Sequence, residues 1–176
     1  MKETKKELIY LLQKAHAGER AAALAYNGHW KSLKDPKEIA QIQIIENDEW
    51  VHRARISEML TEFGAKPLIL RETLFFVIGW SVAIICHFCG RFCSTYFAGI
   101  LENSNVCEYK TAFEYAETLG LKDYAKDFLE MEKTEMEHEI VLQKMIYQHP
   151  FLPFFAFFFR WGSNEKFIVA QQNTEI

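Results

Sequence analysis

One motif, E-x-x-E-x-x-H, occurs twice and decides the fold: Glu46-Asn-Asp-Glu49-Trp-Val-His52 and Glu132-Lys-Thr-Glu135-Met-Glu-His138. In each copy the second glutamate and the histidine are three residues apart, which places both side chains on one face of a helix. Two Glu-x-x-His pairs, with one glutamate from each of two further helices, form the ligand set of two-metal carboxylate sites in four-helix bundles. The repeat therefore predicts a helical bundle built around two metal ions.

Glu19 and Glu102 are well placed to complete this set, because both lie on apolar stripes of other expected helices. Buried carboxylates are costly unless their charge is paired, and four together would repel each other. Two divalent cations would balance the four charges, and two imidazoles would complete a mixed shell that suits iron or manganese. A single E-x-x-H arises by chance on solvated helices, but two copies on apolar stripes favour the metal site. The predicted ligands are Glu19, Glu49, His52, Glu102, Glu135 and His138.

Apolar periodicity predicts an all-α fold. Apolar residues recur at spacings of three and four, and Pro36, Gly64, Gly90 and Gly120 stand where helices are expected to start or end. No alternating strand pattern between hairpin turns is found. We expect a four-helix bundle with two additional short apolar helices. The expected helical segments span about residues 4–33, 36–63, 73–89, 91–119, 122–147 and 151–159.

Length and composition bound the class of protein. The chain has 176 residues, a hydrophobic fraction of 49% and a formal net charge of −4, which fits one domain and lacks the basic excess of a nucleic-acid-binding protein. We expect a single domain over 1–162 and a polar tail over 163–176. The charged N-terminus has no secretory signal, and four cysteines without an extracellular context indicate a reducing compartment. These features predict a cytoplasmic protein without a nucleic-acid partner.

Two segments, 73–90 and 150–160, are apolar on all sides. They are either ordinary buried helices or, as we favour because the bundle has its own apolar stripes, a hydrophobic mouth in a membrane interface. The first segment is borderline in length for a membrane span. Such a mouth would let a lipid-like substrate reach the metals without crossing water. The basic residues expected near lipid headgroups are Arg71, Arg91, Arg160 and Lys166.

Several polar residues near the motifs have more than one interpretation. His16 could contact a metal ligand or substrate, or be a satisfied core histidine. Tyr109, on the inner face with Glu102, could carry a proton or an electron, or pack in the core. Glu46 and Glu132 could be partners of the histidines, although we favour surface positions for both.

Two further groups are expected to have no chemical role. Glu137 and Glu139 flank His138 off the apolar stripe and should be solvated. Cys86, Cys89 and Cys93 would share one helical face, but no second C-x-x-C completes a zinc site, so we expect them to pack as small buried residues.

A series of motifs between about residues 14 and 162 occurs in the order typical of one family: His16-Ala-Gly-Glu19, Glu49-x-x-His52, Lys66-Pro67, Gly90-Arg91, Leu101-Glu102-Asn-Ser with Tyr109, and Glu135-x-x-His138. In this ordered set the sequence resembles the demethoxyubiquinone hydroxylase family, also named Coq7 or CLK-1. It departs from the family where Gly and Ala are replaced by Cys86, Phe88, Cys89, Phe92, Cys93 and Phe97, which would reshape a substrate channel.

The resemblance implies a ferritin-like bundle in which the six predicted ligands hold two iron ions, with manganese as the alternative. It implies O2-dependent hydroxylation of a demethoxy-quinone ring in ubiquinone synthesis, with electrons from NADH or from the reduced quinone. It also implies a protein attached to the cytoplasmic face of the inner membrane, with substrate entering through the apolar mouth. His16 and Tyr109 carry over as accessory catalytic residues.

Two other functions fit the same pattern. A ferritin-like protein that oxidises iron or reduces peroxide would use the same six ligands and need no lipid channel. A non-enzymatic, membrane-docked module would use the metals only for structure. A homodimer that meets through the apolar segments is compatible with the sequence, although no feature specifies it.

Overall fold

The computed structural model describes residues 2–162, and helices are the only regular elements in that range. The prediction of an all-α fold is confirmed. The expected segment 163–176 and Lys166 lie outside the described residues. The helices are α1 (Lys2–Ser32), α2 (Pro36–Glu62), α3 (Ile69–Leu119), α4 (Lys122–Ile146) and α5 (Leu152–Phe159).

The predicted helix boundaries have clear local causes. The side chain of Asp35 caps α2 by accepting a hydrogen bond from the Lys37 backbone N–H at 2.8 Å, and Pro36 occupies the first turn. Gly64 and Gly120, with φ of 68° and 71°, follow the ends of α2 and α3 in the left-handed region that terminates helices.

Helix α3 is two helices joined at Gly90. This glycine has φ 77° and ψ 161°, a conformation that side-chain-bearing residues rarely adopt, so the helical path turns there. The first segment, 69–89, begins earlier than the predicted residue 73, and the second covers 91–119. Arg91, directly after the break, forms an ion pair with Glu38 of α2, with Nε and Oε2 2.8 Å apart. The break is therefore tied to the neighbouring helix.

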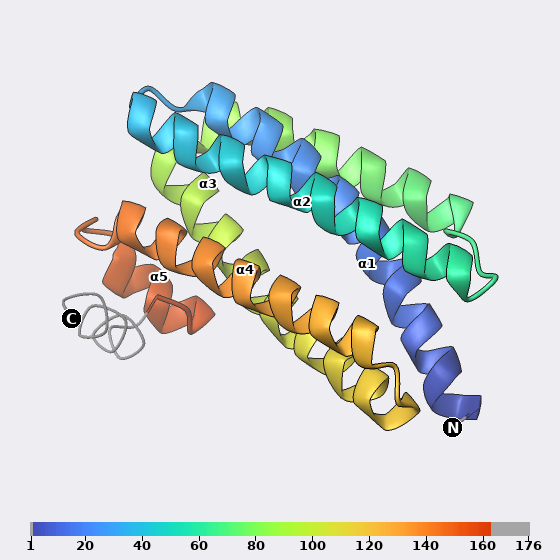
Figure 1. Ribbon diagram of the computed structural model, residues 1–176. Coiled ribbons are helices and arrows are strands. Elements are labelled where there is room, and N and C mark those ends of the chain that lie inside the picture. The colour runs from blue at the N-terminus through green and yellow to red at the C-terminus, as the bar shows by residue number, and fades with distance from the viewer. Residues whose placement is uncertain (1, 163–176) are drawn as a thin grey trace.

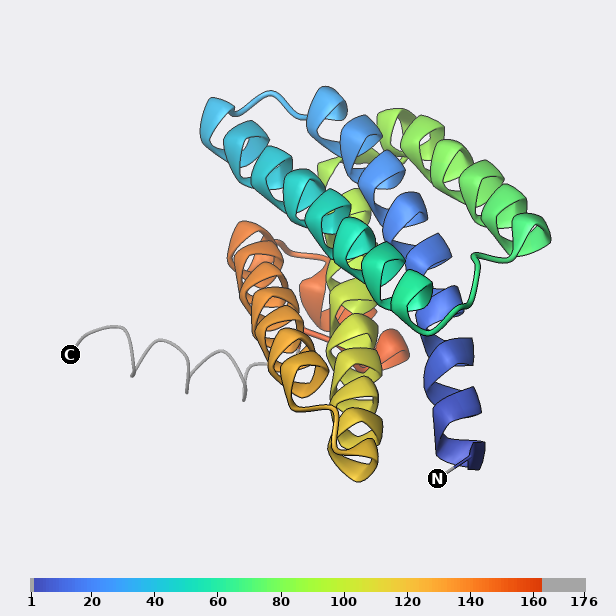
Figure 2. The same ribbon diagram turned by 45° about the vertical axis from the view of Figure 1, so that its right-hand side comes forward.

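Figures 1 and 2 show how the helices pack: α1 and α2 run side by side, the 69–89 segment lies along α1, and the 91–119 segment runs beside α4. The contact between α1 and segment 69–89 is very close. A Cβ added at Gly79 would lie 2.7 Å from the Ala21 carbonyl oxygen, and one at Gly28 would lie 2.3 Å from Ala83 Cα. Small residues thus permit two backbones to approach, and α1, α2, 91–119 and α4 form the four-helix bundle.

The chain after α4 is fastened by buried polar contacts. Tyr96 donates its hydroxyl hydrogen to the Trp161 carbonyl oxygen at 2.9 Å, and Trp161 Nε1 donates to Glu139 Oε1 at 2.8 Å. The Trp161 indole packs directly against Gly99, where an added Cβ would lie only 2.0 Å from a ring carbon. The expectation that Glu139 is solvated is wrong, because Trp161 folds back over it, whereas Glu137 is exposed as predicted.

The 69–89 segment and α5 carry a large exposed apolar surface. Ile69, Leu70 and Phe88 are each 84–85% exposed, and Phe157 is 78% exposed. By length and composition, α3 contains a stretch apolar enough to cross a membrane, and 17% of that stretch is buried in the protein. Exposed apolar side chains that gather on one segment mark candidate interaction surfaces, and this helix is apolar enough to associate with a membrane.

The arginines expected near headgroups differ in their surroundings. Arg160 is exposed. Arg71 stacks over the ring of Tyr10 at 4.7 Å, and Arg91 is held by Glu38. Two of the three described arginines are therefore already engaged within the protein.

Candidate metal centre and apolar cavity

The structure brings the six predicted ligands together in the middle of the bundle, one or two from each of its four helices. None of the six is more than 5% exposed. Their donor atoms form two groups, each within 4.8 Å: Glu19, Glu49, His52 and Glu135, and Glu49, Glu102, Glu135 and His138. Glu49 and Glu135 belong to both groups. This is the arrangement expected for two neighbouring ions that share two carboxylates.

Several of the donor atoms in this cluster are buried without a hydrogen-bond partner. Both carboxylate oxygens of Glu49, Nδ1 of His52 and Nδ1 of His138 are buried and have no hydrogen-bond partner. His52 Nδ1 lies 2.9 Å from Glu135 Oε1, but the two atoms are not aligned for a hydrogen bond. Buried polar atoms are rarely left unsatisfied in proteins. A cation between them would satisfy them all, so this cluster of oxygen and nitrogen donors fits metal ions.

The electrostatics of the cluster favour the same conclusion. Burial raises the pKa of Glu49 and of Glu102 well above its usual range, and the charge of Glu135 raises both further. Burial also raises the pKa of Glu135 to about 8. Carboxylates held in this way bind protons unless positive charge is supplied. Two divalent cations would supply it and keep the oxygens available as ligands.

Two buried tyrosines hold Glu19 and Glu102, the two glutamates that each belong to only one ligand group, and each tyrosine reaches across to the other helix. The Tyr109 hydroxyl of α3 donates to Glu19 of α1, and the Tyr26 hydroxyl of α1 donates to Glu102 of α3. Each tyrosine follows a glutamate of its own helix by seven residues, so the two helices repeat the spacing E-x6-Y. The sequence left Tyr109 open between a role near the metals and a place in the core, and it did not single out Tyr26. The repeated spacing is the signal that could have identified it.

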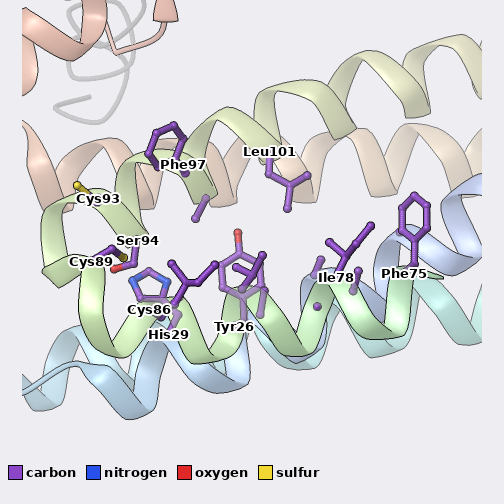
Figure 3. Close-up of a pocket in the computed structure, with 18 of the residues that line it drawn as sticks. Tyr26, His29, Phe75, Ile78, Cys86, Cys89, Cys93, Ser94, Phe97 and Leu101 are labelled. Carbon is purple, nitrogen blue, oxygen red and sulfur yellow. The ribbon is translucent and has the colours of Figure 1, made fainter. Parts of the chain in front are cut away.

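An apolar cavity of about 560 Å³ lies beside this cluster. Figure 3 shows that its lining comes from α1 and from both segments of α3, with Phe75 and Ile78 toward one end and Cys89 and Cys93 at the other. Tyr26 and Asn105 lie on its wall, and each donates a hydrogen bond to Glu102. One layer of side chains therefore separates the cavity from the candidate ligands.

Comparison with known protein families agrees with this geometry. The family model described as ubiquinone biosynthesis protein COQ7 matches residues 6–141. The chain belongs to the COQ7 family. A comparison with curated proteins found no significant match. Family membership gives the chain a role in ubiquinone biosynthesis, and the carboxylate and histidine cluster lies within the matched residues.

In this COQ7 family member the outer partner of a predicted ligand is Asp48. Its Oδ2 lies 3.1 Å from His138 Nε2, which leaves Nδ1 of the same ring directed at the cluster. Such a carboxylate fixes the orientation of a metal-binding imidazole. Glu46 instead accepts hydrogen bonds from Asn27 and Trp30. Asp48 was missed because it lies off the apolar stripe and meets His138 only across the α2 and α4 interface.

His16 does not point at the cluster. Its Nδ1 lies 2.7 Å from Glu72 Oε1, and Arg53 Nη2 lies 2.8 Å from the other oxygen of Glu72. Burial lowers the pKa of His16, which favours the neutral ring. The three residues join α1, α2 and α3. The geometry thus favours the satisfied-histidine interpretation over direct contact with a metal ligand.

The cysteines line the cavity. Cys86 is buried, Cys89 and Cys93 are half-buried, and all are free thiols. Burial raises the pKa of Cys86 to about 11 and raises that of Cys89, so these thiols stay protonated at neutral pH. The expectation of one shared helical face is wrong, because Gly90 interrupts the helix between Cys89 and Cys93. Of the three, only Cys86 is packed as the small buried residue that was expected, whereas Cys89 and Cys93 are half-buried on the cavity wall.

Proposed function

We propose that this protein is a di-iron, O2-dependent hydroxylase that acts on a demethoxy-quinone ring in ubiquinone biosynthesis. The observation that carries the proposal is that the buried carboxylate and histidine cluster lies one layer of side chains, Tyr26 and Asn105, behind the wall of an apolar cavity. Two iron ions held by the six residues would supply O2 activation, a chemistry that oxygen and nitrogen ligand sets support. Manganese is the alternative metal.

The surrounding residues hold this centre in place. The hydroxyl of Tyr26 fixes Glu102, and that of Tyr109 fixes Glu19. Asp48 orients His138. A pre-oriented ligand set lowers the cost of reorganisation during the reaction. The cavity wall is chiefly apolar, and Tyr26 and Asn105 are the side chains that a ring would meet nearest the metals. Tyr109 contacts the ring of His52 edge to face, at 5.6 Å between centroids, so its accessory role acts through the ligands.

We propose that the protein lies on a membrane rather than crossing it. Segment 69–89 has an exposed apolar face, but its other face is packed along α1 through Gly79 and Ala83. A helix held on one side by a charged bundle is suited to the membrane–water interface, where its apolar side enters the acyl-chain region of the lipids. Phe97, on the cavity wall, stacks edge to face with Phe159 of α5. The cavity therefore borders the apolar surface, a route for a lipid-like quinone from the cytoplasmic face of the inner membrane.

A ferritin-like iron-oxidising or peroxide-reducing protein is the second candidate, because the same cluster would serve it. Such a protein has no use for a 560 Å³ apolar cavity that borders an exposed apolar surface. A homodimer through the apolar segments and a non-enzymatic role for the metals remain hypotheses to be tested.

The test is a single-turnover reaction. The protein is loaded with Fe(II) without oxygen and mixed with a short-tail demethoxyquinol, O2 is admitted, and the ring product is weighed by mass spectrometry. We expect a gain of one oxygen atom that is lost in Glu135→Ala and kept in Glu137→Ala, an exposed glutamate of the same helix with 64% side-chain exposure. Iron oxidation without a change in ring mass would leave the metal centre and refute the substrate. Unfolding of Glu135→Ala, followed by circular dichroism, would favour a structural metal.

A further inference from the structure

His29 is a buried polar side chain on the cavity wall with no part in the metal centre. It is 2% exposed and lies three residues after Tyr26 on α1, so the two share a helical face about 4.5 Å apart along the axis. Their rings are stacked with centroids 6.2 Å apart. Figure 3 shows the imidazole between Tyr26 and the cysteine-lined end of the cavity. A ring molecule that reaches Tyr26 would therefore pass or rest beside His29.

Thr95 determines which nitrogen of His29 carries the hydrogen. The Thr95 hydroxyl donates to the Arg91 carbonyl oxygen at 2.8 Å, within its own helix. A hydroxyl has one hydrogen, so Thr95 Oγ1 can only accept from His29 Nε2, which is 3.2 Å away. Burial, reinforced by the charge of Arg91, lowers the pKa of His29 to about 4. At neutral pH the ring is therefore uncharged, with its hydrogen on Nε2.

The other ring nitrogen, Nδ1, is then a pure hydrogen-bond acceptor. Within residues 2–162 no hydrogen bond to it is found. The cavity that His29 lines is chiefly apolar, and its wall includes Val82, Cys86 and Phe97. An acceptor in an apolar site gains from a ligand that brings a donor and is penalised by one that brings another acceptor.

We propose that His29, locked by Thr95, selects the reduced, hydroxyl-bearing form of the ring over its oxidised form. This inference rests on the proposed function, in that it assumes a quinone-type ring. A hydroquinone O–H can donate to Nδ1, whereas a quinone carbonyl offers only lone pairs. Sites built to pair with a substrate hydroxyl discriminate strongly against analogues that lack it. We expect the hydroquinone to bind at least about 10-fold more tightly than the quinone, the factor that corresponds to one hydrogen bond.

The test compares both ring forms on the full chain loaded with Zn(II), which cannot change the oxidation state of the ring. Dissociation constants for a short-tail demethoxy-hydroquinone and its quinone are measured by anaerobic calorimetry. Thr95→Val removes the hydroxyl at nearly constant volume and frees the histidine to present an N–H, so the ratio of the two constants should fall toward one. Thr95→Ser keeps the hydroxyl and should keep the ratio. His29→Gln places both a donor and an acceptor at this position, so it should also lose the preference for the hydroquinone.

Nitrogen-15 NMR of the His29 ring gives an independent reading, since it distinguishes the two neutral tautomers. The proposal requires hydrogen on Nε2 in the unmodified protein and in Thr95→Ser, and a mixture in Thr95→Val. Equal binding of both ring forms to the unmodified protein would overturn it, as would an unchanged ratio in Thr95→Val and His29→Gln. If neither ring form binds to folded protein, the quinone assignment itself fails.

Discussion

The close packing of α1 on α3 can be tested by adding a single methyl group. In Gly28→Ala the new Cβ would lie 2.3 Å from Ala83 Cα, 2.4 Å from Ala83 O and 2.5 Å from Ala83 Cβ. Two of these atoms are backbone and cannot rotate away, so the helices must move apart by about 1 Å to restore ordinary contact. Such overpacking costs up to about 3 kcal/mol, while replacing a helical glycine by alanine recovers about 1 kcal/mol. The net expectation is a loss of about 2 kcal/mol.

Gly18 provides a matched control on the same helix. A Cβ there would meet nothing within 4 Å, so Gly18→Ala should raise stability by about 1 kcal/mol through helix propensity alone. The two variants carry the same chemical change and should shift the free energy of unfolding in opposite directions. Equilibrium urea unfolding followed by far-ultraviolet circular dichroism, at fixed metal and detergent, measures both. Equal stability of the two variants would show that α1 and segment 69–89 are not packed as described.

Three further outcomes are expected. In metal-free protein, burial raises the pKa of Glu135 from 4.5 to about 8. Its protonated form therefore stabilises the fold below pH 4.5, and this contribution is lost as the pH rises toward 8. The urea concentration at the midpoint of unfolding should fall over that pH range, and it should fall less with Mn(II) bound or in Glu135→Gln. Asp48→Asn should weaken metal affinity about 10-fold or more in a metal titration, because His138 loses its orienting carboxylate, and unchanged affinity would remove Asp48 from the site. Phe88→Glu should reduce binding to lipid vesicles about 10-fold in a flotation assay, whereas Ile44→Glu, an exposed apolar position on α2, should not.

Much of the candidate site could be predicted from sequence because its information is local. A Glu-x-x-His pair fixes two side chains on one helical face whatever the helix packs against. The apolar stripe around each pair decides that this face turns inward. The break at Gly90 and the start at Pro36 are also local, since they depend on the backbone freedom of a single residue. These features hold before any two helices meet.

Contacts across helices were decided only by the tertiary structure. Asp48 and His138 are 90 residues apart in the chain, and His29 and Thr95 are 66 apart. Periodicity tells which face of a helix is buried, but it carries no information on how far one helix slides or rotates against the next. The exposure of Glu139 was predicted wrongly for this reason, since its partner Trp161 follows α5 in the chain and packs back against α4. The apolar cavity, with His29 on its wall, is formed where the turn at Gly90 sets the two segments of α3 around α1.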